Sequence, residues 1–236
     1  MSYPYKAYFE TLLSYNDAAK KSYLRTSLFE EDGLGHAKIV KHTEGTKDSG
    51  YSKRKEWIKN GKTCHFSSMI HCDIFSIKKY LIPEVSIKID LQRAKENFFL
   101  LAESKYKDRF EMELIDLKLH LKTVKVSKDL DDFISNAIDG GRKAQYSFIE
   151  SGVSFNSIGL GLLQTEIHSI YQGILPLTIF CCLVNNSAID GEISENPWCF
   201  ENKGVKSFQF IGKTNICNSL RYMLESTSDL TVFTDH

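Results

Sequence analysis

The feature of this sequence that most constrains its fold is a two-residue alternation of apolar and polar side chains. The segment 84–91 (EVSIKIDL) is the clearest case, and its apolar positions are Val85, Ile87, Ile89 and Leu91. Successive side chains of an extended chain point to opposite faces, so Ser86, Lys88 and Asp90 share the other face. The pattern predicts an amphipathic strand that is half buried against a core.

Similar segments recur along the chain after Gly61. Residues 110–126 alternate with one change of phase near Ile115, where a β-bulge would restore the facing. Further strands are predicted over 145–155, 163–171, 176–184 and 205–211. Roughly eight strands joined by short turns are typical of an antiparallel sandwich. We therefore expect a mainly β fold, an antiparallel β-sandwich, over residues 62–213.

Two segments have a helical period instead. In the N-terminal segment 1–31, apolar side chains recur at helical spacing, at Tyr5, Tyr8, Phe9, Leu12 and Leu13. Between Ser127 and Gly141, a serine that can cap, several aspartates and a final Gly140-Gly141 pair predict one short inserted helix. Residues 32–61 are polar, glycine-rich and charged in both signs, so a flexible loop is expected there.

The charge balance argues against two classes of partner. Lys and Arg together number 30, as do Asp and Glu, so no net field draws the chain to nucleic acid or to an anionic membrane. The longest apolar stretch, 174–184, contains Pro176 and is shorter than the ~20 residues that a spanning helix needs. We expect a buried strand there and no membrane partner.

The cellular compartment is predicted from the N-terminus and the cysteines. The opening MSYPYKAYFE lacks the basic start and the apolar run of a secretory signal. The six cysteines show no repeated spacing. An intracellular protein with reduced thiols is expected.

The doublets Cys64-His65 and His71-Cys72 are the candidates for a metal site, because zinc accepts both ligand types. Their spacing is not a known zinc spacing, and neighbours on a strand face opposite sides. The pair Cys181-Cys182 would point apart for the same reason, which favours core packing over redox chemistry. No metal site is predicted.

The remaining motifs have structural interpretations. The carboxylates of Asp190, Glu192 and Glu195 lack EF-hand spacing, so an exposed acidic loop is expected. Gly159 and Gly161 lack the third glycine, the lysine and the helix of a phosphate loop, so they indicate a turn. Neither Gly-x-Ser-x-Gly nor His-Glu-x-x-His occurs. The sequence predicts no enzyme, no catalytic residue and no cofactor.

Lys53-Arg54-Lys55, with Trp57 and Lys59 nearby, is the densest basic cluster. Basic residues beside an aromatic ring are typical of sites that follow a nucleic-acid backbone. In a chain of zero net charge a solvated loop is the favoured interpretation. No specific nucleic-acid binding is expected.

Several segments, in their order, carry a family resemblance. A Tyr-rich helix precedes an Ala-Lys-x-Ser element and a Leu-Phe pair, at Ala19, Lys20, Ser22, Leu28 and Phe29. A His-x-Asp-x-Phe segment and an Arg-x-Lys element follow, at His71, Asp73, Phe75, Arg93 and Lys95. The stretch 175–210 adds Val184, Asn185, Asn186, Gly191, Asn196 and Pro197. In this order the chain resembles the N-terminal part of the double jelly-roll major capsid protein of Polinton (Maverick) type elements.

The resemblance implies a non-enzymatic structural protein that builds capsid shells by self-association. Family members fold as two jelly rolls and form trimers, and a penton-like capsid protein is a further partner that the resemblance allows. It also implies a virion or nuclear location. Because family members are nearly twice as long, this chain is interpreted as truncated before the second jelly roll, with 214–236 as a divergent C-terminal tail.

Two other interpretations stay open. The chain can be a jelly-roll binding module for a carbohydrate or a protein partner, or a decayed, domesticated capsid remnant. A binding module requires a concave pocket lined with aromatic side chains, whereas a capsid module requires a wide apolar surface. An enzyme would require a catalytic constellation that the sequence does not offer.

Overall fold

The chain consists of two compact units that alternate along the sequence. Our computed structural model describes residues 2–31, 49–83, 85–94, 96–107, 109–168, 170, 176–201, 203–210 and 220–223. Unit 1 comprises Met1–Ser14, Met69–Arg93 and Met112–Val153. Unit 2 comprises Tyr15–Ser68, Ala94–Glu111 and Ser154–His236.

The described residues of unit 1 form three helices. They are α1 (Ser2–Ser14), the short 3-10 helix η3 (Asp73–Ser76) and α5 (Lys128–Asp139). The helix expected near the N-terminus is therefore present as α1, and its inward face is marked by Tyr5, which is 2% exposed, and by the buried Thr11. The Thr11 hydroxyl donates to the carbonyl of Ala7, one turn earlier, so this buried polar group is satisfied within the helix.

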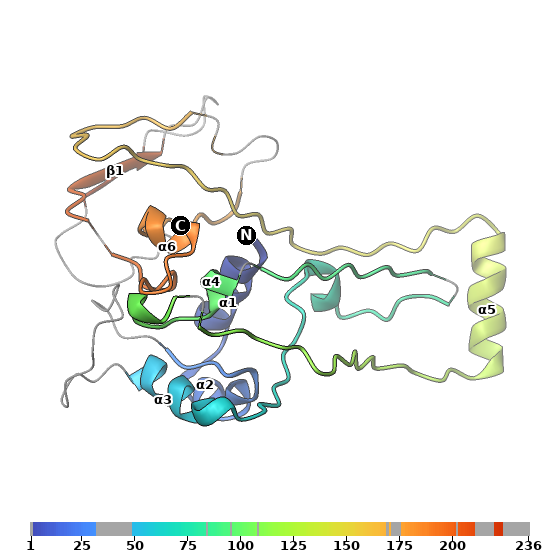
Figure 1. The fold of residues 1–236 in the computed structure, drawn as a ribbon. Helices are drawn as coiled ribbons and strands as arrows, with labels where there is room; N and C mark the ends of the chain where they lie inside the picture. Colours follow the sequence, from blue (N-terminus) through green and yellow to red (C-terminus); the bar gives the residue numbers. More distant parts are fainter. Residues whose placement is uncertain are drawn as a thin grey trace. The chain divides into compact units, whose positions relative to one another are not determined.

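The predicted inserted helix is present as α5, and its ends follow the expected signals. Ser127 is the N-cap residue with an extended backbone, although its side chain makes no capping hydrogen bond. At the other end, the Arg142 amide donates to the Ala137 carbonyl and the Gly141 amide to the Ile138 carbonyl. This is the Schellman arrangement, and it requires the left-handed backbone that Gly141 adopts at φ +83°. Two long extended segments join α5 to the rest of unit 1 (Figure 1).

The prediction of a mainly β jelly-roll sandwich over 62–213 is wrong. In the part of the chain that the structure describes, the only strands are β1 (Ser207–Phe210) and β2 (Leu220–Met223), which pair antiparallel. β1 lies within the strand expected over 205–211. In their described residues, the other predicted strands show no backbone ladder, and the segments 85–94 and 110–126 are examples. The alternation of apolar and polar residues predicts which side chains share a face. It does not predict which other segment forms backbone hydrogen bonds with the strand.

Unit 2 contains most of the short helices. They are α2 (Asp17–Lys21), η1 (Tyr23–Ser27), α3 (Ser49–Trp57), η2 (Lys59–Gly61), α4 (Glu96–Phe99), η4 (Ser104–Tyr106) and α6 (Asn186–Asp190). Asn16 caps α2 by accepting a hydrogen bond from the Ala19 amide at 2.9 Å. The described part of the expected polar loop, 49–61, thus holds α3 and η2. Of the expected C-terminal tail, residues 220–223 are described and form β2.

The buried part of unit 2 lies where α4 meets the segment 186–201. The rings of Phe98 and Trp198 meet edge to face, with centroids 5.5 Å apart. The Ala102 amide donates to the Ile193 carbonyl at 2.9 Å, and Asn196 accepts a hydrogen bond from the Trp198 amide through its side chain. A segment expected to be a loop is therefore the best-packed part of this unit.

The apolar stretch 174–184 was expected to be a buried strand, and its described residues do not form one. Over 176–184 the chain forms no strand, and Leu177 and Phe180 are exposed. Residues 174 and 175 lie outside the described residues. Among the described residues, no helix combines the length and the apolar character needed to cross a bilayer.

Candidate functional site

The densest polar cluster of unit 1 is centred on the carboxylate of Asp73. Lys6 in α1 donates to Asp73 Oδ1 over 2.6 Å, and both side chains are mostly buried. Ser151 donates to the same carboxylate through its hydroxyl at 3.1 Å and through its amide at 3.2 Å. Three segments that are distant in sequence therefore meet at one side chain.

A second set of contacts joins α1 to the residues before η3. The His71 amide donates to the hydroxyl of Tyr3 at 3.0 Å, and His71 Nδ1 lies 3.2 Å from Glu10 Oε2. Tyr3, Lys6 and Glu10 are three and four residues apart, so they lie on one face of α1. This polar face aligns the helix along residues 71–73.

Asp73 is held in its charged form. Burial raises the pKa of its carboxyl group, but the hydrogen bonds from the Lys6 ammonium and from the amide and hydroxyl of Ser151 act in the opposite direction. The pKa of Asp73 is consequently below its ordinary value. A carboxylate with a lowered pKa is a good ion-pair partner and a poor general base.

The cluster contains serine, histidine, aspartate and lysine, but its geometry is not that of a nucleophile and its base. Ser151 donates its hydroxyl proton to Asp73, and His71 is engaged with Glu10. Within the described residues, no hydrogen bond joins Ser151 to His71. A serine nucleophile needs a base that accepts its proton and that is itself oriented by a third group. The arrangement therefore acts as a structural junction.

Side-chain contacts continue this junction along unit 1. The Tyr146 hydroxyl donates to the Tyr80 carbonyl at 3.2 Å and accepts from the Ile82 amide at 3.0 Å. Lys79 donates to the Gln145 carbonyl at 3.4 Å. Together with the contact between Asp73 and Ser151, these bonds show that segments 73–82 and 145–151 run antiparallel. Side chains supply the hydrogen bonds that a backbone ladder supplies in a sheet.

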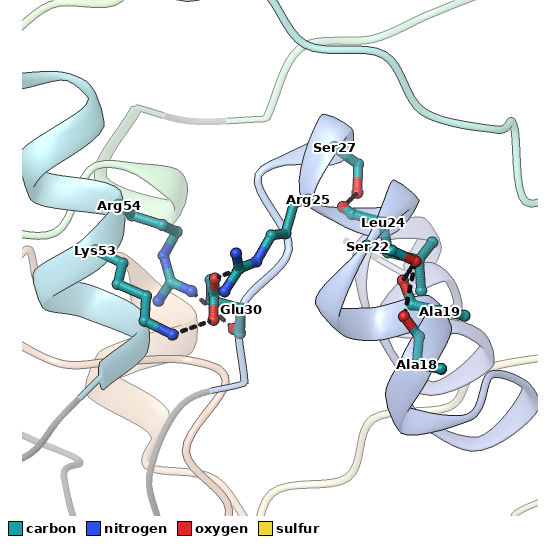
Figure 2. Close-up of polar contacts among 9 residues, drawn as sticks. All are labelled: Ala18, Ala19, Ser22, Leu24, Arg25, Ser27, Glu30, Lys53 and Arg54. Atoms are coloured by element: carbon teal, nitrogen blue, oxygen red, sulfur yellow. Dashed lines mark hydrogen bonds and ion pairs between the residues drawn. The ribbon is translucent and has the colours of Figure 1, made fainter.

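The main polar cluster of unit 2 surrounds Glu30. The Glu30 carboxylate lies 3.0 Å from Arg25 Nε and 2.9 Å from Lys53 Nζ, and Arg54 donates to the backbone carbonyl of Glu30 at 2.9 Å. Figure 2 shows the Glu30 carboxylate between Arg25 and Lys53, with Lys53 and Arg54 extending from α3. The cluster attaches α3 to the chain that follows η1.

This cluster changes the interpretation of the basic run at Lys53-Arg54-Lys55. Two of its three cations contact Glu30, Lys53 at the carboxylate and Arg54 at the backbone carbonyl. Lys55 lies 6.0 Å from the centre of the Tyr51 ring. Lys59 pairs with Glu56 at 3.4 Å. These cations already have intramolecular partners, so releasing them to phosphates would cost those contacts. The run belongs to a helix rather than to a solvated loop.

The Cys/His doublets do not assemble a metal site among the described residues. Cys64 and His65 belong to unit 2, whereas His71 and Cys72 belong to unit 1. His71 is directed to Glu10. In the described part of the chain, no three His, Cys, Asp or Glu side chains are grouped as metal ligands.

The adjacent Cys181 and Cys182 form no disulfide, and neither do Cys64, Cys72 and Cys199. Cys217 lies outside the described residues. Desolvation by nearby protein atoms raises the pKa of Cys182 to about 11, with a smaller contribution from Cys181. The pKa of Cys181 is raised by the same cause. A thiol with a raised pKa is a poor redox nucleophile. Both residues are exposed rather than packed in a core, which corrects the sequence-based expectation.

The acidic segment after α6 is occupied by local hydrogen bonds. The hydroxyl of Ser187 donates to the carboxylate of Glu195, and Ser194 donates to Glu192 at 3.1 Å. Asp190 ends α6. Gly159 and Gly161 lie at a turn, and Gly161 has a left-handed backbone at φ +80°. The carboxylates of Glu192 and Glu195 therefore accept hydrogen bonds from serine side chains that lie close to them in sequence.

Sequence reasoning missed the partners in both clusters. The sequence marked His71 as a candidate metal ligand and as part of the family resemblance, and Asp73 only as part of that resemblance. It did not mark Lys6, Ser151 or Glu30. The polar face of α1 offered a signal, since Tyr3, Lys6 and Glu10 recur at helical spacing. No local pattern identifies Ser151, which is 78 positions from Asp73.

Unit 1 also exposes a large number of apolar side chains. Leu117, Leu119 and Leu121 lie on one side of an extended segment and are 63%, 55% and 65% exposed. Val85, Ile87 and Leu91 are exposed on another segment of the same unit. Leu114, Val124 and Val126 are also exposed, on the segment that holds the three leucines. Soluble monomers seldom expose so many large apolar side chains together. We call these nine side chains the apolar segments of unit 1.

The comparisons with known proteins are sparse. No protein-family model and no solved structure matches the chain. The chain is 24% identical over 205 residues to the uncharacterized protein F54H12.2 of Caenorhabditis elegans. The match covers 86% of this chain and 46% of that protein. The chain thus spans less than half the length of this relative.

Proposed function

We propose that this chain is a non-enzymatic structural protein that self-associates, in the manner of the Polinton-type capsid proteins that it resembles. The observation that carries the proposal is the exposure of the apolar segments of unit 1. Burying a large aliphatic side chain from water contributes roughly 1.5–3 kcal/mol when burial is complete. Nine such side chains supply a substantial driving force for association even when each is only half exposed.

The polar clusters support a structural role rather than catalysis. Asp73 is hydrogen-bonded by Lys6 and Ser151, and Glu30 forms ion pairs with Arg25 and Lys53. Side chains that are paired in this way hold segments together and have no proton acceptor available for a substrate. The zero net charge also favours self-association, because copies of the chain do not repel one another through a net field.

The resemblance makes the proposal more specific. It implies a trimer as the building block of a shell, and a location in a virion or in the nucleus. The C. elegans relative supports a connection with longer proteins, since the match covers less than half of it. We infer that the apolar segments of unit 1 contribute to contacts between copies or with further capsid components.

The proposal is tested by substituting one face of a single extended segment. Leu117→Ser, Leu119→Ser and Leu121→Ser together remove three exposed apolar side chains. Lys118→Ser, His120→Ser and Lys122→Ser are the matched control on the alternate positions of the same segment. We expect the leucine variant to lower the mass measured by light scattering and the control to keep it. Equal masses for wild type and both variants would contradict a role for this surface.

A further inference from the structure

Helix α5 presents an apolar face that its own unit does not cover. Its apolar side chains follow the spacing i, i+3, i+4, i+7, i+8 and form one stripe, made of Leu130, Phe133, Ile134, Ala137 and Ile138. No residue of α5 is buried, and Phe133 at the centre of the stripe is 63% exposed. An amphipathic helix of this kind buries its stripe against a partner.

Charges border the stripe at its two ends. With about 100° between successive residues, Asp129 and Asp131 lie on opposite sides of the stripe at the N-terminal end of the helix. Arg142 and Lys143 follow the Gly140-Gly141 pair that ends the helix. All four residues are exposed, and among the described residues none of these side chains forms an ion pair. The acidic end and the basic end are separated by roughly 18 Å, the length of a twelve-residue helix.

We propose that α5 binds α5 of a second copy in an antiparallel arrangement, stripe against stripe. An antiparallel pair places Asp129 and Asp131 of each copy beside Arg142 and Lys143 of the other, so the chain supplies its own complementary charges. A parallel pair would place the aspartates beside one another. The antiparallel contact is isologous, with the same surface used by both copies, as two-fold symmetry requires. This inference rests on the proposed function and names the surface through which copies of neighbouring trimers meet, since a two-fold contact pairs copies two at a time and does not build the trimer itself.

The test uses two charge-reversed variants of the full chain. One carries Asp129→Lys with Asp131→Lys, and the other carries Arg142→Glu with Lys143→Glu. In sedimentation equilibrium we expect each variant alone to associate at least tenfold more weakly than wild type, because like charges then meet at both ends of the pair. An equimolar mixture should restore association, since each variant complements the other. Asp132→Lys with Asp139→Lys is the matched control, because both residues lie on the opposite side of α5 and the charge change is equal.

A third variant tests the apolar stripe without changing a charge. Phe133→Ser should weaken association at least tenfold and leave the helical signal in circular dichroism unchanged, since Phe133 packs against no interior. Wild-type association that none of the variants alters, or a mixture that fails to restore association, would contradict the α5 contact while leaving the proposed function standing. A wild-type chain that stays monomeric would overturn both.

Discussion

Lys6 and Asp73 are 67 positions apart in sequence, and their side chains meet at 2.6 Å in unit 1. Through this ion pair α1 is attached to η3, and through Ser151 the same carboxylate also holds the segment that follows α5. The amphipathic α1 thus depends on a polar contact for its position, in addition to the burial of Tyr5. The junction gives unit 1 a definite connection between its three segments.

Replacing the Asp73 carboxylate tests how much this junction contributes to the free energy of unfolding. We expect Asp73→Asn to lower the free energy of unfolding by about 1–2 kcal/mol, because the ammonium of Lys6 loses its charged partner in a mostly buried place. Urea unfolding followed by circular dichroism measures the change. Asp17→Asn is the control, since Asp17 is exposed and lies 3.9 Å from Lys21; its effect should stay within about 0.5 kcal/mol. Equal effects of both substitutions would contradict the junction.

The same carboxylate predicts a dependence of stability on pH. Because the folded-state pKa of Asp73 is below its ordinary value, the group stabilises the folded chain fully above that ordinary value. This contribution is lost as the pH falls through the lowered pKa. The difference in free energy of unfolding between wild type and Asp73→Asn should therefore be constant at neutral pH and shrink as the pH falls below the ordinary pKa of an aspartate side chain. A difference that grows on acidification would have the wrong sign for this account.

Sequence reasoning succeeded where the signals are local. Ser127 at the N-cap position, the first-turn aspartates and the paired glycines all lie within a few residues of α5, whose ends they mark. It failed where the structure depends on distant partners. The alternation predicts that Leu117, Leu119 and Leu121 share one side of the segment. Within the described residues, however, no second strand pairs with this segment and no sandwich forms. Likewise, no sequence pattern near Ser151 or Lys6 indicates that these residues contact Asp73.

The packing of unit 2 predicts a large effect at one aromatic residue. Phe98 is 3% exposed and meets Trp198 edge to face, so Phe98→Ala removes a buried ring and leaves a cavity. We expect a loss of about 3 kcal/mol in the free energy of unfolding. Phe148→Ala is the control, because Phe148 is exposed. Hydrogen exchange should show faster exchange over 186–201 in the Phe98 variant alone, and unchanged exchange there would count against the described packing.

The raised pKa of Cys182 predicts slow alkylation. A pKa of about 11 instead of 9.0 lowers the thiolate fraction below pH 9 by roughly a hundredfold, while the greater nucleophilicity of the thiolate recovers about tenfold. Iodoacetamide should therefore modify Cys182 about tenfold more slowly than an unperturbed cysteine peptide at pH 8. Mass spectrometry of digested samples measures the rate at each cysteine. A rate at or above that of the peptide would contradict the desolvation of Cys182.

The central claim is that this chain associates with copies of itself. Size-exclusion chromatography with light scattering on the full chain, over a range of concentrations, measures this most directly. We predict a mass above that of the 27.0 kDa monomer that rises with concentration, with a trimer or larger assemblies as the end state. A folded chain that elutes as a monomer at every concentration would contradict the proposed structural role.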